Sequence, residues 1–121
     1  MNRQEVGKLG EKLAQEFLKR KGYHILMTGF RCREGEIDII AQQKDYLVFV
    51  EVRTRSSLRF GTPEESITQN KKEKLITSAL TYISTHQNIP SLWRIDVVAI
   101  EIDPKGKAKR IELIENAIGQ D

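Results

Sequence analysis

Two acidic residues interrupt two neighbouring apolar runs of the chain, and this pattern constrains the fold more than any other feature. Asp38 lies within residues 35–40 and Glu51 within residues 49–53, and both runs are typical of β-strands. Burying an ionised carboxylate in such a strand is costly unless an opposite charge or hydrogen bonds compensate it. Where two carboxylates converge, a divalent cation is the usual compensation. Glu51 and Arg53 should also point to one face, because side chains alternate along a strand.

The register of the two runs follows from the polar segment between them. If the chain folds about the Lys44–Asp45 bond, residues equally distant from this bond are opposite, so Asp38 faces Glu51 and Glu36 faces Arg53. Directly opposed side chains have Cβ atoms roughly 5 Å apart, which is close enough for two carboxylates to share one ion. Because the segment lacks Asn-Gly and Asp-Gly, we expect a four-residue loop centred on this bond.

The length and composition indicate one intracellular domain. We expect a single domain over residues 1–121, and the net charge of +3 is compatible with a polyanionic partner. Cys32 is the only cysteine, which excludes an internal disulfide and favours a reducing compartment. The chain has no apolar run of roughly 20 residues, and its first residues lack the apolar core of a signal peptide. We therefore expect a cytoplasmic protein that does not enter a membrane.

The apolar periodicity predicts two helices and four or five strands. The first helix is expected to start at the capping pair Asn2 and Glu5 and to end at Gly22. Its apolar stripe consists of Val6, Leu9, Leu13 and Phe17. A second helix is expected to start at the cap Thr62 and to stop at residues 88–90. Strands are expected at residues 23–30, 36–41, 47–55, 93–102 and 110–114.

This order, α-β-β-β-α-β-β, predicts an α/β fold with a mixed central sheet of four to five strands flanked by helices. Several short motifs accompany the order: Gly10-Glu11, residues 35–38, residues 48–55, Phe60-Gly61, Lys71 and residues 94–98. Order and motifs together resemble the PD-(D/E)XK superfamily, the restriction-endonuclease-like nucleases, which includes the archaeal Holliday-junction resolvases. More closely, the chain resembles the YraN-type family of small bacterial proteins. The resemblance covers nearly the whole chain and implies a restriction-endonuclease-like core.

The resemblance also implies a catalytic set, which is Glu11, Asp38, Glu51 and Arg53. Asp38 and Glu51 match the metal-binding acids of the superfamily, and with the carbonyl of Val52 they would hold Mg²⁺ or Mn²⁺ as cofactor. Glu11 matches a glutamate that many members place near the metal. Arg53 stands where most active members have lysine, and arginine can stabilise phosphoryl charge but cannot exchange a proton.

Residues around these acids suggest how they are brought together and what they meet. Gly7, Gly10 and Ala14 would let the first helix approach another backbone closely, which could deliver Glu11 to the site, although an exposed glutamate is an equal alternative. The basic residues expected to contact phosphates are Arg55, Arg59, Lys71, Lys72 and Lys74. Trp93 and Tyr82 are expected in the core rather than as platforms for nucleobases.

Three functions remain open from the sequence. The leading one is a magnesium-dependent endonuclease that hydrolyses phosphodiester bonds in DNA or structured nucleic acid. The second is a nucleic-acid-binding module of the same fold without catalysis, and Arg53 is the residue that favours it. The third is a protein-interaction domain with purely structural acids. The expected partner is nucleic acid, DNA first, and because so small a chain covers little of a duplex, a homodimer is also considered.

Overall fold

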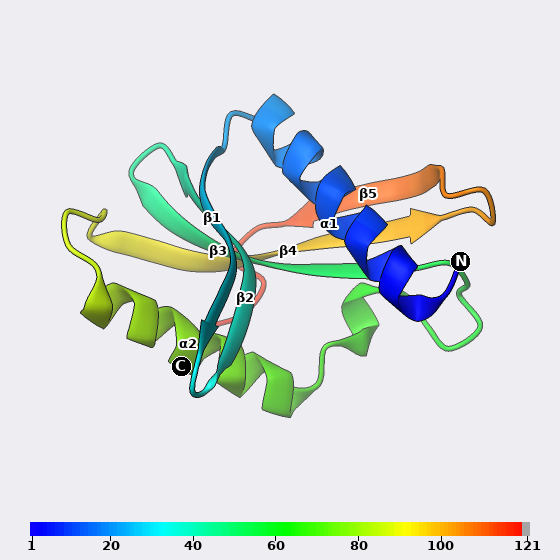
Figure 1. Cartoon of the computed structure of the whole chain (residues 1–121). Helices are drawn as coiled ribbons and strands as arrows, with labels where there is room; N and C mark the ends of the chain where they lie inside the picture. The colour runs from blue at the N-terminus through cyan, green and yellow to red at the C-terminus, as the bar shows by residue number, and fades with distance from the viewer. Residues whose placement is uncertain (120–121) are drawn as a thin grey trace.

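The computed structural model describes residues 1–119 and places a five-stranded sheet between two helical layers (Figure 1). The elements are α1 (Arg3–Arg20), β1 (His24–Cys32), β2 (Gly35–Gln43), β3 (Tyr46–Arg55), the 3-10 helix η1 (Glu64–Ser66), α2 (Gln69–Thr85), β4 (Leu92–Ile102) and β5 (Ala108–Ile114). The strands lie side by side in chain order. Strands β3 and β4 are parallel and the other neighbours are antiparallel. The predicted element order and mixed sheet are confirmed.

Helix α1 begins where the sequence predicts, and most of the predicted apolar stripe contacts the core. Asn2 and Glu5 form the capping box, in which each side chain accepts a hydrogen bond from the other residue's backbone N–H. Val6 of the predicted stripe is buried, and Leu9 and Leu13 pack against the same core while remaining partly exposed. The most buried positions are Val6, Gly10, Ala14 and Leu18, which are spaced by four. Two small residues therefore form the middle of the contact with the sheet.

Gly10 explains why small residues are needed there. A Cβ added at Gly10 would lie 1.8 Å from Thr54 Oγ1 and 2.8 Å from Thr54 Cβ, so α1 approaches β3 too closely for any side chain. This contact fixes the N-terminal half of α1 over the end of β3. Glu11, the next residue, is thereby held beside that end of the sheet.

The second helix starts later than predicted. Thr62 and Glu65 do exchange capping hydrogen bonds, but they enclose only the short helix η1. Ile67 then returns to extended backbone, and α2 starts at a second cap, in which Thr68 Oγ1 accepts from the Lys71 N–H. Two successive caps therefore divide what the sequence pattern suggests is one helix.

The β2–β3 hairpin has the predicted register but a tighter turn. Ile39 pairs with Val50 and Gln43 with Tyr46, as folding about the Lys44–Asp45 bond requires. The turn has two residues rather than the expected four. Lys44 adopts φ 54°, a left-handed conformation that favours glycine or asparagine, so the sequence gives no warning of this turn.

Strand β2 is irregular at Asp38. Ile39 packs in the core on the α1 side, whereas Ile37, two residues earlier, packs on the α2 side. In a regular strand both would face one side. On the neighbouring strand β1, Gly29 lies between the pairs that flank Asp38 and has φ 63°. The β1–β2 hairpin therefore changes face at Asp38, and it curves away from the rest of the sheet (Figure 1).

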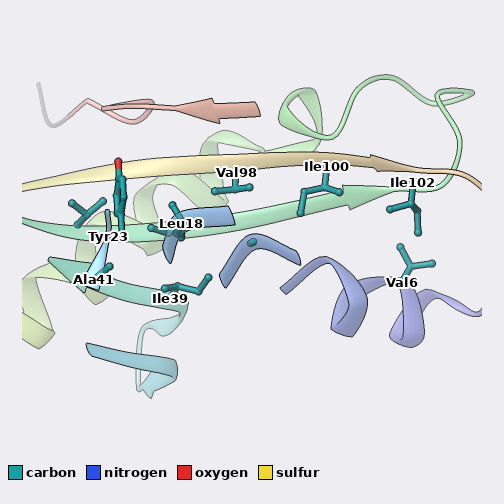
Figure 2. Packing of buried hydrophobic residues seen from close by; sticks show 11 residues of the cluster. Val6, Leu18, Tyr23, Ile39, Ala41, Val98, Ile100 and Ile102 are labelled. Atoms are coloured by element: carbon teal, nitrogen blue, oxygen red, sulfur yellow. The ribbon is translucent and has the colours of Figure 1, made fainter. Parts of the chain in front are cut away.

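Each face of the sheet carries one apolar core. On the α1 side, Val6 and Leu18 lie against strand residues that include Ile39, Val98 and Ile102 (Figure 2). On the α2 side, Phe49, Leu75 and Tyr82 lie in the second core. Tyr82 is 5% exposed and Trp93 packs against the same core, which confirms that these aromatic residues are structural.

A polar network is buried near the N-terminal end of β4. Asp96 is fully buried and accepts hydrogen bonds from Arg94 Nε at 3.0 Å, from the Tyr23 hydroxyl at 3.0 Å and from the Asn116 N–H at 2.9 Å. The Arg94 guanidinium also donates to the Tyr23 hydroxyl at 2.9 Å and lies over the ring of Tyr46. This network ties together segments that are distant in the sequence.

The close approach of α1 to β3 predicts opposite effects for two glycines of the same helix. Gly10→Ala should lower the free energy of unfolding by roughly 1–3 kcal/mol, because the new methyl group collides with Thr54. Gly7→Ala is the matched control, since a Cβ there meets no atom of the described residues within 4 Å. It should stabilise the protein by up to about 1 kcal/mol through helix propensity. Urea denaturation distinguishes them, and equal gains for both variants would contradict the contact.

Candidate functional site

The candidate site forms where β2 and β3 separate. Their backbone pairing extends only to Ile39 and Val50, and beyond this point β2 changes face. The Asp38 carboxylate takes the place of a backbone partner, because the Val52 N–H donates to Asp38 Oδ2 at 2.8 Å. This hydrogen bond fixes the Asp38 side chain in the opening between the strands.

The structure brings the Asp38 and Glu51 carboxyl groups together. Glu51 is 4% exposed, and burial raises its pKa to about 7, with the Asp38 charge and a hydrogen bond to Asp38 acting in the same direction. Burial also raises the pKa of Asp38, although hydrogen bonds from Val52 and Glu51 oppose the rise. Two carboxyl groups that share a site favour the protonated form of one of them.

Two cations also contact Glu51. Arg53 Nε and a terminal nitrogen of the same guanidinium donate to Glu51 Oε2 at 2.9 Å and 2.8 Å. The shared face of Glu51 and Arg53 is therefore confirmed. Lys71 Nζ, from the first turn of α2, lies 3.9 Å from the same oxygen. These contacts occupy one oxygen of Glu51, as Val52 occupies one oxygen of Asp38.

The predicted pairing of Glu36 with Arg53 is wrong. Glu36 forms an ion pair with Arg31 of β1 at 3.4 Å, and Arg53 pairs with Glu51. The reason is the irregularity at Asp38, which turns the start of β2 away from β3. The sequence register holds only for the part of the hairpin nearer the turn.

A groove of about 750 Å³ opens beside the acids. Glu11, Glu36 and Asp38 line it, together with Val52 and Arg53 of β3. Burial raises the pKa of Glu11, and the charges of Asp38 and Glu36 add to the rise. Glu11 is therefore close enough to interact electrostatically with Asp38 and Glu36. This agrees with the expectation that the small residues of α1 bring Glu11 to the site.

The predicted phosphate-contacting residues do not form one patch. Arg55 lines the groove, and the Arg59 guanidinium lies 5.5 Å from the centroid of the Phe60 ring, which also lines it. Lys71 belongs to the acidic pair rather than to an outer surface.

The two remaining lysines lie elsewhere on α2. Lys72 lines a separate hollow with Ile67 and Ile118, and Lys74 packs near Gly35. The three lysines that the sequence groups together therefore have different neighbours in the structure. Arg3 and Phe60 also line the groove, which the sequence reasoning missed, although Phe60-Gly61 is one of the motifs of the resemblance.

The described residues carry few ligands for a metal beyond the carboxyl pair. Within residues 1–119, no group of three or more His, Cys, Asp or Glu side chains is arranged to hold a metal ion. In the same residues, no helix has the length and apolar character needed to cross a membrane.

The chain matches one protein family over most of its length. The family model, described as the uncharacterised protein family UPF0102, matches residues 10–100, which include Glu11, Asp38 and Glu51. The chain belongs to the UPF0102 family. It is 48% identical over 120 residues to a UPF0102 protein of Dehalococcoides mccartyi, and the match covers 99% of this chain and 98% of that protein.

Further UPF0102 proteins show similar agreement. A relative from Caldicellulosiruptor bescii is 48% identical over 118 residues, covering 97% of this chain and 99% of the relative. One from Renibacterium salmoninarum is 46% identical over 108 residues, covering 89% and 91%. The family membership confirms the resemblance to YraN-type proteins, while the names of these relatives state no substrate or reaction.

The raised pKa of Glu51 predicts that the free energy of unfolding falls as pH rises. Glu51 titrates near 7 in the folded chain and near 4.5 when exposed, so between these values the folded state binds more protons than the unfolded state. In EDTA, the parent should therefore lose up to about 3 kcal/mol of unfolding free energy between pH 4.5 and 8. Asp38→Asn should lose clearly less, because it removes the charge that opposes ionisation of Glu51.

Glu16→Gln is the matched control, since Glu16 is an exposed acid of α1. It should keep the pH dependence of the parent in the same urea titrations. A parent profile parallel to that of Asp38→Asn would show that the two carboxyl groups do not interact.

Proposed function

We propose that this chain is a PD-(D/E)XK-type nuclease domain that hydrolyses phosphodiester bonds of nucleic acid, DNA in the first instance, with a bound divalent cation. The observation that carries the proposal is the meeting of the Asp38 and Glu51 carboxyl groups at the point where β2 and β3 separate. The element order and the restriction-endonuclease-like resemblance support it.

The residues present fit a hard cation such as Mg²⁺ or Mn²⁺. Val52 and Arg53 each engage one carboxyl oxygen, Asp38 Oδ2 and Glu51 Oε2, which leaves the second oxygen of each carboxyl for the partner carboxyl or a cation. A cation would offset the burial that raises the pKa of both carboxyl groups and the Asp38 charge that adds to the rise at Glu51. Magnesium commonly uses one or two carboxylates and completes its coordination with water and phosphate oxygens. When bound, it would polarise the phosphate and lower the pKa of a coordinated water.

The surrounding side chains divide the remaining tasks. The Val52 N–H and the Arg53 guanidinium hold Asp38 and Glu51 in place. Arg55 lines the groove, and in this proposal it contacts a phosphate. Lys71 can exchange a proton, whereas Arg53 cannot, and Lys71 Nζ lies 3.9 Å from Glu51. Lys71 thus supplies from α2 the chemistry that the departure at Arg53 removes from β3.

One observation favours the second candidate, a nucleic-acid-binding module without catalysis. Two of the three guanidinium nitrogens of Arg53 are engaged by Glu51, so this residue acts as a structural counter-ion in the observed arrangement. A single panel separates the candidates: linear, branched and single-stranded DNA and RNA, each with magnesium, manganese or EDTA. Binding in EDTA with metal-dependent cleavage supports the nuclease, binding alone supports the module, and neither leaves the protein-interaction domain.

Metal binding should stabilise the parent and not Asp38→Asn. At ten times its dissociation constant, an ion that binds only the folded state adds about 1.4 kcal/mol. Asp38→Asn should lose this gain and all cleavage, while remaining at least as stable as the parent without metal, because asparagine still accepts the Val52 N–H. Thermal denaturation with magnesium, manganese or EDTA measures it. An unchanged metal-induced shift in Asp38→Asn would place the ion elsewhere.

Exchanging the two cations tests their roles. Lys71→Arg keeps the charge beside Glu51 but removes the exchangeable proton, so cleavage should fall by roughly 100-fold or more. Adding Arg53→Lys to this variant should restore much of the rate, because lysine then stands on the neighbouring strand. Single-turnover cleavage in magnesium measures both. A Lys71→Arg rate equal to that of the parent would show that Lys71 contributes charge alone.

A further inference from the structure

An exposed aromatic ring lies on the groove and is not used by the chemistry described above. Phe60 is 80% exposed, whereas aromatic residues of the core such as Phe49 and Tyr82 are almost fully buried. A single exposed apolar side chain is ordinary on a protein surface, but this ring also lines the groove that Asp38 lines. The neighbouring turn is ordered by the Gly61 N–H, which donates to the Leu58 carbonyl, and by the Arg59 N–H, which donates to Ser57 Oγ. The ring is therefore presented on a defined turn.

The surroundings of Phe60 are basic and face the acids. The Arg59 guanidinium lies 5.5 Å from the ring centroid. Arg3 and Arg55 line the same groove as Phe60, and Asp38 lines it as well. An aromatic face beside several arginines complements a strand that has both flat bases and phosphates. The positive charges disfavour a second copy of the chain, whose Phe60 would carry the same arginines into the interface.

We propose that Phe60 is a stacking platform for an unpaired nucleobase, so that the groove prefers nucleic acid with a single-stranded or branched segment. This inference rests on the proposed function and specifies its substrate class. A base within a duplex is already stacked on both sides, whereas an unpaired base can lie on the phenyl ring. Arg3, Arg55 and Arg59 would then contact the phosphates on either side, and the strand would lead along the groove toward Asp38.

The test compares two strands that differ only in their bases. Fluorescent oligothymidylate and an abasic strand of equal length carry the same charge, and EDTA prevents cleavage while anisotropy measures binding at low salt. The parent should bind oligothymidylate more tightly than the abasic strand. Phe60→Leu should lose roughly tenfold in affinity for oligothymidylate, in line with about 1–3 kcal/mol per stacked base, and keep its affinity for the abasic strand.

Two control variants make the result specific. Phe60→Tyr retains a stacking ring and should bind both strands like the parent. Leu58→Ala removes a neighbouring exposed apolar side chain and should also leave the base preference unchanged. Because Phe60 is so exposed, Phe60→Leu should leave the midpoint of urea denaturation unchanged, which keeps the comparison free of folding effects.

The outcomes separate this inference from the proposed function. Equal affinities of the parent for both strands, or an equal loss for both in Phe60→Leu, would overturn stacking and leave the nuclease proposal intact. A parent that sediments as a dimer, with Phe60→Leu as a monomer, would assign the ring to an interface between copies and overturn stacking. Failure of the parent to bind either strand would overturn stacking, and the panel of linear and branched substrates with metal would then decide the nuclease proposal separately.

Discussion

The hydrogen bond from the Val52 N–H to the Asp38 carboxylate is the contact on which the site depends. It occurs where β2 leaves β3, and there it satisfies a backbone donor that would otherwise lose its partner. The same bond holds a carboxylate beside buried Glu51, at an electrostatic cost that is visible in the raised pKa values. Two carboxyl groups held in this arrangement favour the binding of a positive charge between them.

Much of the fold is predictable from local sequence patterns. The predictions that were wrong concern features that depend on tertiary contacts. The polar segment about the Lys44–Asp45 bond predicts the hairpin register as far as Ile39, and the capping box predicts the start of α1. The deep burial of Gly10 was not predictable from apolar periodicity, because it results from the close approach of α1 to Thr54. The tight turn at Lys44 and the change of face at Asp38 likewise depend on backbone conformations that cannot be predicted from the residue types at these positions.

The site was predictable for its acids and less so for its cations. Acids in apolar strands stand out in a sequence, because solvent exposure cannot explain them readily. Cations are abundant, and Lys71 and Lys72 look alike along the chain, although only Lys71 lies beside Glu51. Distinguishing them requires the position of α2 relative to β3, which depends on where the two successive caps end η1 and begin α2. The position of Phe60 on the groove was not predicted for another reason, because the exposure of a side chain is known only once the folded surface is known.

The buried network of Arg94, Asp96 and Tyr23 has a consequence for how the sheet is specified. Strand β4 is apolar on both faces between Val97 and Ile100, so sliding it by one position along β3 would exchange similar aliphatic side chains. Such a slip would carry Arg94 and Asp96 to the α2 side, away from Tyr23, and leave two buried charges without their partners. The network thus specifies the register of β4 against β3, which hydrophobic burial alone does not determine. It thereby sets the alignment of β4 with the strand that carries Glu51.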